Sequence, residues 1–308
     1  MTILVLGAAA GGGFPQWNCN CHNCRGLRQG TLKTKARTQS SIAVSADLLN
    51  WTVINASPDI LAQLKACPQL QPARWLRDTG IRAVILVDSQ IDHTAGLAML
   101  REGNRLAVYC TASVREDLMT GNPLFRMLEN YCGVTWHEVR TAPGADFRIS
   151  GVDGIELAAV PVRSKAPPYS LHRDLPQEGD NIALMMTDVA SGQRAFYAPG
   201  IAEVDARVWE CMSRADCILV DGTFWTDDEM IRLGVGHKRG VEMGHLAQSG
   251  ENGMLSFLRR LPRTRRVLIH INNTNPILDE DSDERRELDR AGVEAAYDGM
   301  ELVLGART

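Results

Sequence analysis

Short apolar runs, spread along the whole chain, constrain the fold more than any other feature of this sequence. Each run is brief, rich in valine and isoleucine, and bounded by glycine, aspartate or proline, which is typical of buried strands. The predicted strands are 3–6, 41–44, 51–55, 83–87, 106–110, 155–162, 182–187, 195–197, 217–220 and 266–270, and helical spacing predicts helices at 57–66, 94–101, 113–119, 202–214, 250–260 and 281–291. Because neither a repeat nor a low-complexity linker interrupts this alternation, we expect one α/β domain over residues 1–308 with helices packed outside sheets.

The balance of apolar and charged residues excludes several classes of protein. The chain has 308 residues, of which 44% are hydrophobic and 23% charged, with a formal net charge of -4. The charged fraction is too high for a polytopic membrane protein, and no apolar stretch approaches the roughly 18 residues of a membrane-spanning helix. A weakly negative chain offers no positive field for nucleic acid. Residues 1–7 read as a first strand and not as a signal peptide. We therefore expect a cytoplasmic protein without membrane or nucleic-acid partners.

Three cysteines, Cys19, Cys21 and Cys24, lie within six residues of one another. In a reducing cytoplasm, clustered cysteines bind metal more often than they form disulfides. A tight loop can direct three thiolates at one ion, and Zn²⁺ accepts sulfur in a closed tetrahedral set whose fourth ligand must come from elsewhere in the chain. The sequence therefore predicts a structural zinc site. An iron–sulfur cluster or a redox function is the alternative, and His22 is expected to face solvent.

Several predicted strands end in residues that can bind a divalent metal. The strand 83–87 leads into a polar turn with Asp92 and His93, and two later strands end at Asp221 and His270. His245 is expected to open a helix. Nitrogen and carboxylate donors suit a divalent ion, although a capping aspartate beside a packed histidine would give the same Asp-His pair. Together these endings form a candidate active site.

After a glycine-rich start, the strand followed by Asp-His-x-x-Gly-Leu resembles the metallo-β-lactamase superfamily, whose usual signature is His-x-His-x-Asp-His. In this register Asp88 and Gln90 replace the first two histidines, whereas Asp92 and His93 keep the last two places. His270 matches the ligand that follows the last core strand of the family. The resemblance implies an αββα four-layer sandwich of two mixed sheets with helices outside.

Two further ligand positions of the superfamily are changed. Gly200 stands where the family carries an aspartate that bridges two metals, and Arg163 stands where it carries another histidine. The resemblance therefore implies that the dinuclear zinc site of the hydrolases is dismantled in this chain. One metal remains supplied, by Asp92, His93 and His270.

The segments 11–21, 88–93, 221–225, 243–245 and 270–276 together resemble the family of pyrroloquinoline quinone (PQQ) synthesis B proteins. This resemblance implies an iron-dependent hydroxylase of PQQ biosynthesis. Its substrate would be a small molecule derived from a precursor peptide, the cross-linked glutamate–tyrosine diamino acid, whose tyrosine ring is oxygenated. The alternatives are a carrier of PQQ or its precursor to the periplasm, and a zinc-dependent hydrolase. Other proteins of the pathway and a second copy of the chain in a homodimer are the further partners considered.

The expected chemistry assigns roles to single residues. Asp92, His93 and His270 offer the two imidazoles and one carboxylate of the facial triad that binds Fe²⁺ or another divalent metal. His245 is a candidate acid–base group for the phenol or, alternatively, a cap or a partner of a ligand. Asp221 is a candidate ligand or an orienting partner of a histidine. The candidates for substrate contact are Asp88, Gln90, Arg163 and Lys165.

A related phosphodiesterase branch of the superfamily binds a structural zinc through three N-terminal cysteines and a histidine three residues beyond the last active-site histidine. Asn273 holds that place in this sequence. The resemblance therefore implies Cys19, Cys21, Cys24 and Asn273 as the ligands of a structural Zn²⁺, with the asparagine as an unusual fourth ligand.

Overall fold

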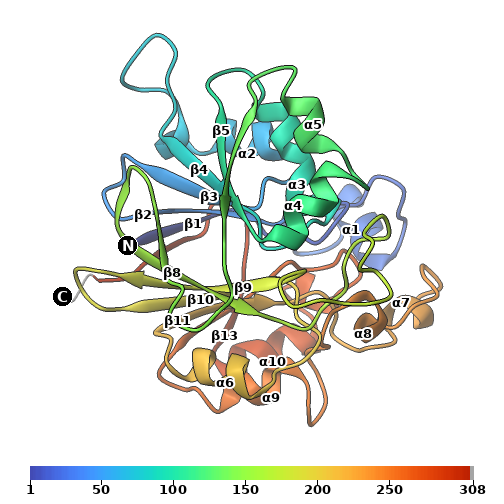
Figure 1. Cartoon of the computed structure of the whole chain (residues 1–308). Helices are drawn as coiled ribbons and strands as arrows, with labels where there is room; N and C mark the ends of the chain where they lie inside the picture. The colour runs from blue at the N-terminus through green and yellow to red at the C-terminus, as the bar shows by residue number, and fades with distance from the viewer. Residues whose placement is uncertain (306–308) are drawn as a thin grey trace.

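The computed structural model describes residues 1–305 and contains two seven-stranded sheets that pack face to face (Figure 1). The first sheet has the order β14-β1-β2-β3-β4-β5-β6. It is antiparallel from β14 to β3 and parallel from β3 to β6. Its strands are β1 (Thr2–Gly7), β2 (Ser41–Ser45), β3 (Trp51–Ile54), β4 (Ile81–Ile85), β5 (Leu106–Cys110), β6 (Val134–Glu138) and β14 (Glu301–Val303).

The second sheet repeats this division into an antiparallel half and a parallel half. Its order is β13-β12-β11-β10-β9-β8-β7. It is antiparallel from β7 to β10 and parallel from β10 to β13. Its strands are β7 (Phe147–Ile149), β8 (Val152–Pro161), β9 (Ile182–Asp188), β10 (Arg194–Ala198), β11 (Cys217–Asp221), β12 (Arg265–Ile269) and β13 (Val293–Ala295).

Alternate residues of the central strands face opposite sides of each sheet, as strand geometry requires. In β1, Ile3 and Val5 point into the core between the sheets, whereas Leu4 and Leu6 point to the outer face. Both faces are apolar because both are covered, one by the other sheet and one by helices. This double burial explains why the central strands are uninterrupted apolar runs in the sequence.

Helices cover the outer face of each sheet (Figure 1). α2, α4 and α5 pack on the first sheet, and α6, α9 and α10 pack on the second. Figure 1 shows α1, α7 and α8 together at one end of the sandwich. The α-helices are α1 (His22–Gln29), α2 (Ile60–Ala66), α3 (Ile91–Thr94), α4 (Ala112–Met119), α5 (Leu124–Leu128), α6 (Ala206–Ser213), α7 (Glu229–Arg232), α8 (Gly240–Met243), α9 (Met254–Arg259) and α10 (Asp283–Ala291). The 3-10 helices are η1 (Pro68–Leu70), η2 (Ala95–Leu100) and η3 (Pro276–Leu278).

This arrangement confirms the predicted α/β sandwich of two mixed sheets with helices outside. Each strand predicted from the sequence is present, with small shifts at the ends. Within residues 1–305, every helix is too short or too polar to cross a membrane.

Two local predictions are wrong. His245 does not open a helix, because Gly244 adopts a left-handed φ of 95° that closes α8, and the next helix begins only at Met254. The predicted α-helix at 94–101 is the 3-10 helix η2. Gly96 N donates to Ala56 O of a neighbouring segment at 2.9 Å, which takes this donor away from the α-helical pattern.

Candidate active site and cysteine cluster

Polar residues that follow strands of both sheets line a cavity of about 200 Å³. Asp92 and His93 come after β4 of the first sheet, whereas Thr223 follows β11 and His270 follows β12 of the second sheet. The cavity therefore lies where carboxyl ends of strands meet, which is the usual place for a site in an α/β protein. The lining residues are Ala10, Gly11, Asp88, Gln90, Asp92, His93, Ser164, Asn181, Gly200, Thr223, Phe224, Met230, Met243, His245, His270 and Asn272.

The structure brings the three predicted ligands Asp92, His93 and His270 together, with donor atoms within 4.8 Å of one another. His270 Nε2 lies 3.1 Å from Asp92 Oδ2, and His93 Nε2 lies 4.0 Å from the same oxygen. His93 Nε2 is fully buried and has no hydrogen-bond partner among the described residues. An orphaned buried nitrogen costs free energy. A metal ion coordinated by this nitrogen and its two neighbours would remove that cost, so the residues present fit a metal.

Neighbouring side chains fix the orientation of both histidines. His93 Nδ1 lies 2.8 and 2.9 Å from the two carboxylate oxygens of Asp88, which turns Nε2 toward Asp92. Thr223 Oγ1 lies 3.0 Å from His270 Nδ1 and leaves the other nitrogen to face Asp92. Such support of the far nitrogen is usual for metal-binding histidines. The φ of 61° at His270 is left-handed and turns the chain sharply at the end of β12.

Opposite charges in a buried setting dominate the electrostatics of this cluster. Burial opposes the charged form of His93, but the carboxylates of Asp88 and Asp92 raise its pKa to about 9. Burial also opposes the ionised form of Asp92, but the charges of His93 and His270 hold the pKa of this carboxyl well below its usual range. A metal-bound imidazole must give up its second proton, so metal affinity at this site should fall at low pH.

His245 lies beside the triad on the cavity wall, with its ring stacked on His270 at a centroid distance of 5.2 Å. His245 Nδ1 is 2.7 Å from Asp221 Oδ2 and 3.1 Å from Thr223 Oγ1. Asp221 is fully buried behind this ring and also accepts hydrogen bonds from Thr223 N and Ile201 N. Burial opposes the charged form of His245, but Asp221 raises its pKa. The geometry of Asp221 is that of an orienting partner.

Gly200, Gln90 and Arg163 stand at positions where the metallo-β-lactamase superfamily has metal ligands. The first two lie on the cavity wall and the third lies outside it. Gly200 and Gln90 line the cavity, and Gln90 Nε2 donates to Lys165 O at 2.8 Å. The side chain of Arg163 is 76% exposed, and its Nη1 lies 2.8 Å from Glu203 Oε2. Neither Arg163 nor Lys165 is among the residues that line the cavity. The structure thus places neither of these two predicted substrate contacts on the cavity wall.

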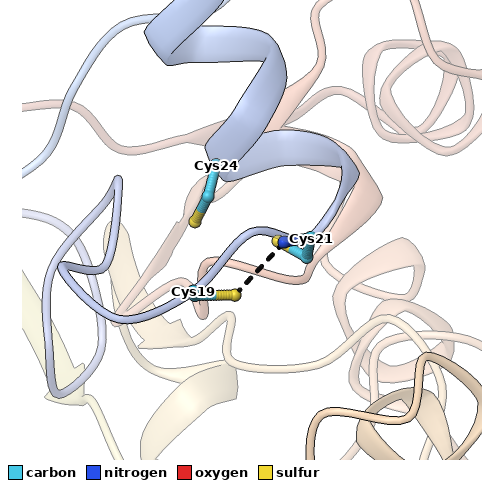
Figure 2. A group of neighbouring side chains, drawn as sticks. All are labelled: Cys19, Cys21 and Cys24. Carbon is cyan, nitrogen blue, oxygen red and sulfur yellow. Dashed lines mark hydrogen bonds between the residues drawn. The ribbon is translucent and has the colours of Figure 1, made fainter.

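The three predicted zinc-binding cysteines converge beside α1, as Figure 2 shows. Cys19 and Cys21 lie in the loop before this helix and Cys24 in its first turn, and Cys21 N donates to Cys19 Sγ at 3.5 Å. All three are free cysteines, and His22 is exposed between them. Burial and the neighbouring sulfurs raise the pKa of the Cys21 thiol to about 12. Metal binding would therefore have to displace a thiol proton here as well.

Asn273 reaches the same point from the turn after β12. Its Nδ2 lies 3.1 Å from Sγ of Cys19, 3.6 Å from Sγ of Cys21 and 3.3 Å from Sγ of Cys24. Rotation of the amide about its Cβ–Cγ bond exchanges nitrogen and oxygen. The cluster then offers three sulfurs and one oxygen in a closed set, which fits a tetrahedral metal.

One short turn, residues 270–275, joins the two clusters. His270 faces the cavity, and Asn273, three residues later, faces the cysteines. On the cysteine side, Asn23 Nδ2 donates to the main-chain oxygens of Asn273 at 3.0 Å and Asn275 at 2.9 Å. The helix that carries the last cysteine therefore also anchors this turn.

A buried carboxyl, Glu229, anchors the other side of the turn. Thr274 Oγ1 donates to Glu229 Oε1 at 2.5 Å, and Trp225 N donates to Oε2 at 2.7 Å. Asn272 Nδ2 in turn donates to Thr274 Oγ1 at 2.5 Å. Burial raises the pKa of Glu229 to about 7. This carboxyl thus holds the turn between the two clusters in place.

Sequence reasoning missed several residues of the cavity wall. Thr223 and Asn272 each lie two residues beyond a predicted site residue, Asp221 or His270, so this proximity was a usable signal. Asn181 carries no such signal. It precedes β9, far from every motif, and only the assembly of the second sheet brings it to the cavity.

The fold and the site define a protein of the β-lactamase superfamily. Residues 50–271 match the family model described as Beta-lactamase superfamily domain. A solved diphosphatase of the PhnP family shares the fold, with a TM-score of 0.68 and 18% identity over 98% of this chain and 96% of its own. The chain belongs to this superfamily.

More similar relatives identify the family within it. Coenzyme PQQ synthesis protein B of Azoarcus sp. (strain BH72) is 62% identical over 306 residues, which cover 99% of this chain and 100% of the relative. The crystal structure of Zn²⁺-bound PqqB from Methylobacterium extorquens matches with a TM-score of 0.90 and 38% identity, over 99% of this chain and 100% of that one. The chain therefore belongs to the family of coenzyme PQQ synthesis B proteins, which confirms the resemblance seen in its motifs.

Proposed function

We propose that this protein acts in PQQ biosynthesis as an iron-dependent oxygenase that hydroxylates the tyrosine ring of a cross-linked glutamate–tyrosine diamino acid. The name of a relative that is 62% identical over nearly the whole chain supports the pathway. The observation that carries the proposed reaction is the set of donors at the cavity, a carboxylate and two imidazoles that converge on one point.

The donor set fits a single ion. His93 Nε2 is buried without a partner and, together with Asp92 and His270, presents three donors on one side of the cavity. Two signature positions that bind metal in the hydrolases have other tasks here, because Asp88 supports His93 and Gln90 donates to a main-chain oxygen. Two imidazoles and one carboxylate with open positions form the set that non-haem Fe²⁺ oxygenases use.

Bound Fe²⁺ would supply the one-electron chemistry that dioxygen activation requires. Hydroxylation of one ring carbon incorporates one oxygen atom of O₂ and releases the other as water, so it consumes two protons and two electrons from a reductant. The side chains of Asp88 and Thr223 keep His93 and His270 in fixed orientations. Fixed ligands avoid the reorganisation that would otherwise add to the barrier.

His245 is proposed as the acid–base group for the substrate phenol. Its Nδ1 contacts the carboxylate of Asp221, so Nε2 remains for the cavity. An imidazolium that forms when His245 takes the phenol proton is stabilised by this buried carboxylate. The effect of Asp221 on the pKa of His245 has the direction that this role needs.

A structural Zn²⁺ at Cys19, Cys21, Cys24 and Asn273 is the second part of the proposal. Its support is the convergence of three sulfurs on one amide. The relative from Methylobacterium extorquens is described as Zn²⁺-bound. An ion at this point would tie the loop before α1 to the turn at 270–275, and binding free energy at such a site adds to folding free energy.

A zinc-dependent hydrolase is the second candidate, because Asp221, His245 and His270 form another group of donors within 4.8 Å. Two ions that share His270 would resemble a two-metal hydrolytic site. Against this, both oxygens of Asp221 already accept hydrogen bonds from Thr223 and Ile201 in the protein. The orienting role of Asp221 therefore favours the oxygenase.

The test is a reaction with defined components. Purified protein is loaded anaerobically with Fe²⁺, the cross-linked diamino acid and ascorbate are added, and O₂ is admitted. We expect a product heavier by oxygen, and none with Asp92→Ala or His93→Ala. Full activity of these variants, or no product with iron bound, would overturn the proposal. Cleavage of phosphodiesters or esters with two metals per site would support the hydrolase, and tight metal-independent binding of PQQ without turnover would support the carrier.

A further inference from the structure

One amide on the cavity wall is left free by the protein. Asn181 is 6% exposed and lines the cavity, yet no group within residues 1–305 forms a hydrogen bond with its side chain. Its amide atoms are not among the fully buried polar atoms that lack a partner, so they keep some accessible surface. Because Asn181 lines the cavity, this surface faces the cavity. A largely buried amide without a partner is costly unless a ligand or water satisfies it.

The backbone that leads to Asn181 is firmly held. His172 Nδ1 lies 2.8 Å from Asp180 Oδ1, and both residues are buried. Thr111 Oγ1 donates to Gly179 O at 2.6 Å, which ties the same segment to the start of α4. The position of Asn181 is therefore fixed from its N-terminal side.

The backbone of Asn181 and of the residue after it is also fixed. Val162 N donates to Asn181 O at 3.1 Å, and Ile182 N donates to Val87 O at 2.9 Å. The second contact places Asn181 next to the segment that leads into Asp88 and the ligand-bearing turn. A rigid backbone with a free amide is the arrangement of a preorganised binding group.

The other neutral polar side chains of the wall each donate at least one hydrogen bond to the protein. Gln90 Nε2 donates to a main-chain oxygen at 2.8 Å, and Ser164 Oγ does so at 2.9 Å. Thr223 Oγ1 donates to a buried carboxylate at 2.6 Å, and Asn272 Nδ2 donates to a hydroxyl at 2.5 Å. The lining residues include neither lysine nor arginine. Gln90 Nε2 uses one of its two hydrogens in this way, whereas both hydrogens of Asn181 Nδ2 remain for an acceptor on a ligand.

We propose that Asn181 is a substrate-binding residue whose Nδ2 donates a hydrogen bond to a carboxylate of the amino-acid substrate. The inference rests on the proposed function, which supplies a substrate with several carboxylates. It assigns substrate contact to Asn181 in place of the candidates Arg163 and Lys165, which do not line the cavity.

The test measures affinity by calorimetry with Fe²⁺-loaded protein in the absence of oxygen. The probes are the cross-linked diamino acid and its methyl ester, in which the carboxylates are masked. We expect Asn181→Ala to weaken binding of the acid about tenfold, the value of one hydrogen bond to a charged group. Asn181→Asp should weaken it further, since it places like charges together. Binding of the ester should change little, and in turnover KM should rise while kcat is retained.

Asn104→Asp is the matched control, because Asn104 is exposed in the loop before β5, at the opposite end of that strand from the cavity. Metal content and the unfolding midpoint of each variant establish that it is folded. If Asn181→Asp does not fold, the comparison of Asn181→Ala with the wild type is the test. If Asn181→Ala binds the acid as tightly as the wild type, the assignment of Asn181 is wrong, whereas the proposed function is not affected. An equal loss for acid and ester also overturns it, because that result indicates a structural role. A wild-type protein that binds neither probe overturns the proposed function, and this assignment with it.

Discussion

The two ligand clusters lie on one turn, three residues apart at His270 and Asn273, but they are built in opposite ways. In the cysteine cluster three sulfurs surround one amide, so four donors close around a single point. In the triad three donors border a cavity of about 200 Å³ and leave one side open. Closed sets stabilise zinc proteins, whereas open sets perform chemistry. A single turn can therefore present both kinds of site.

The clusters also differ in the distance along the chain over which they are assembled. Cys19, Cys21 and Cys24 come from one loop and one helical turn, and a single distant residue completes the set. Asp92 and His270 are separated by 178 positions and come from different sheets. Damage to the cysteine cluster should therefore affect mainly stability, and damage to the triad mainly activity.

Removal of one sulfur should have the largest effect on stability. Cys21→Ser should lower zinc content and reduce the free energy of unfolding by on the order of 4 kcal/mol. Loss of a structural metal is one of the few mechanisms by which a single substitution destabilises a protein this strongly. Denaturant unfolding and metal analysis measure both. Cys67→Ser, at a half-buried cysteine outside the cluster, is the control. If Cys21→Ser changes neither stability nor metal content, the structural zinc site is wrong.

Substitution of the neighbouring histidine should have the opposite signature. His270→Asn should lower the rate of hydroxylation by more than about 100-fold, the upper end of what loss of a partner to a metal ligand costs. Asparagine tolerates the left-handed backbone at this position, so zinc at the cysteines and the unfolding midpoint should be nearly unchanged. The exposed His22→Asn is the control. Equal loss of zinc and activity in His270→Asn would show that the clusters are not separable.

The buried carboxyl that holds the turn predicts a pH effect on stability. The pKa of Glu229 is raised to about 7 in the folded protein, from 4.5. Between these values the folded state keeps a proton that the unfolded state loses, so stability is full below about pH 4.5 and falls by about 2–3 kcal/mol as the pH rises to 7. Glu229→Gln should remove this fall. Denaturant unfolding at pH 5 and pH 8 measures the difference. Glu251→Gln, at an exposed glutamate, is the control. If the pH dependence of stability is unchanged in Glu229→Gln, this carboxyl does not cause it.

The smallest effect concerns the identity of the fourth zinc ligand. Asn273→Ala should weaken zinc binding about tenfold, whereas Asn273→Asp, which keeps an oxygen at the same place, should retain it or bind more tightly. Competition with a chelator gives the two affinities. Equal weakening in both variants would show that Asn273 packs against the sulfurs without ligating the ion. In either case hydroxylation should be affected far less than in His270→Asn.

The interior of both sheets could be predicted from the sequence, but their edges could not. The strands that the apolar runs missed are β6, β7, β13 and β14, and each is an edge strand. Interior strands are covered on both faces and read as continuous apolar runs. Edge strands are short or partly exposed, as in β14, where Glu301 and Val303 face solvent on either side of one buried leucine. Nothing local in such a sequence distinguishes a strand from a loop.

The candidate sites divide in the same way. The residues with a local pattern, such as the cysteines and the Asp92–His93 pair, are where the motifs place them, and each cluster is completed by one residue of the turn after β12. The supporting contact between Asp88 and His93 and the free amide of Asn181 depend on the paths of the backbone in three dimensions. Such contacts follow from how the sheets pack, which spacing along the chain does not record.

The position of β14 has a consequence for how the protein is made. Residues 2–4 at the start of the chain pair with residues 301–303 near its end, and His270 and Asn273 also come late. Loops of this length are slow to close, so folding should be dominated by distant pairings. A ribosome that has not yet reached residue 270 has already made Asp92, His93 and the three cysteines but neither of the residues that complete their clusters. Metal loading at both sites should therefore wait until His270 and Asn273 have been made, and chains that stop before residue 270 should bind metal poorly at each site.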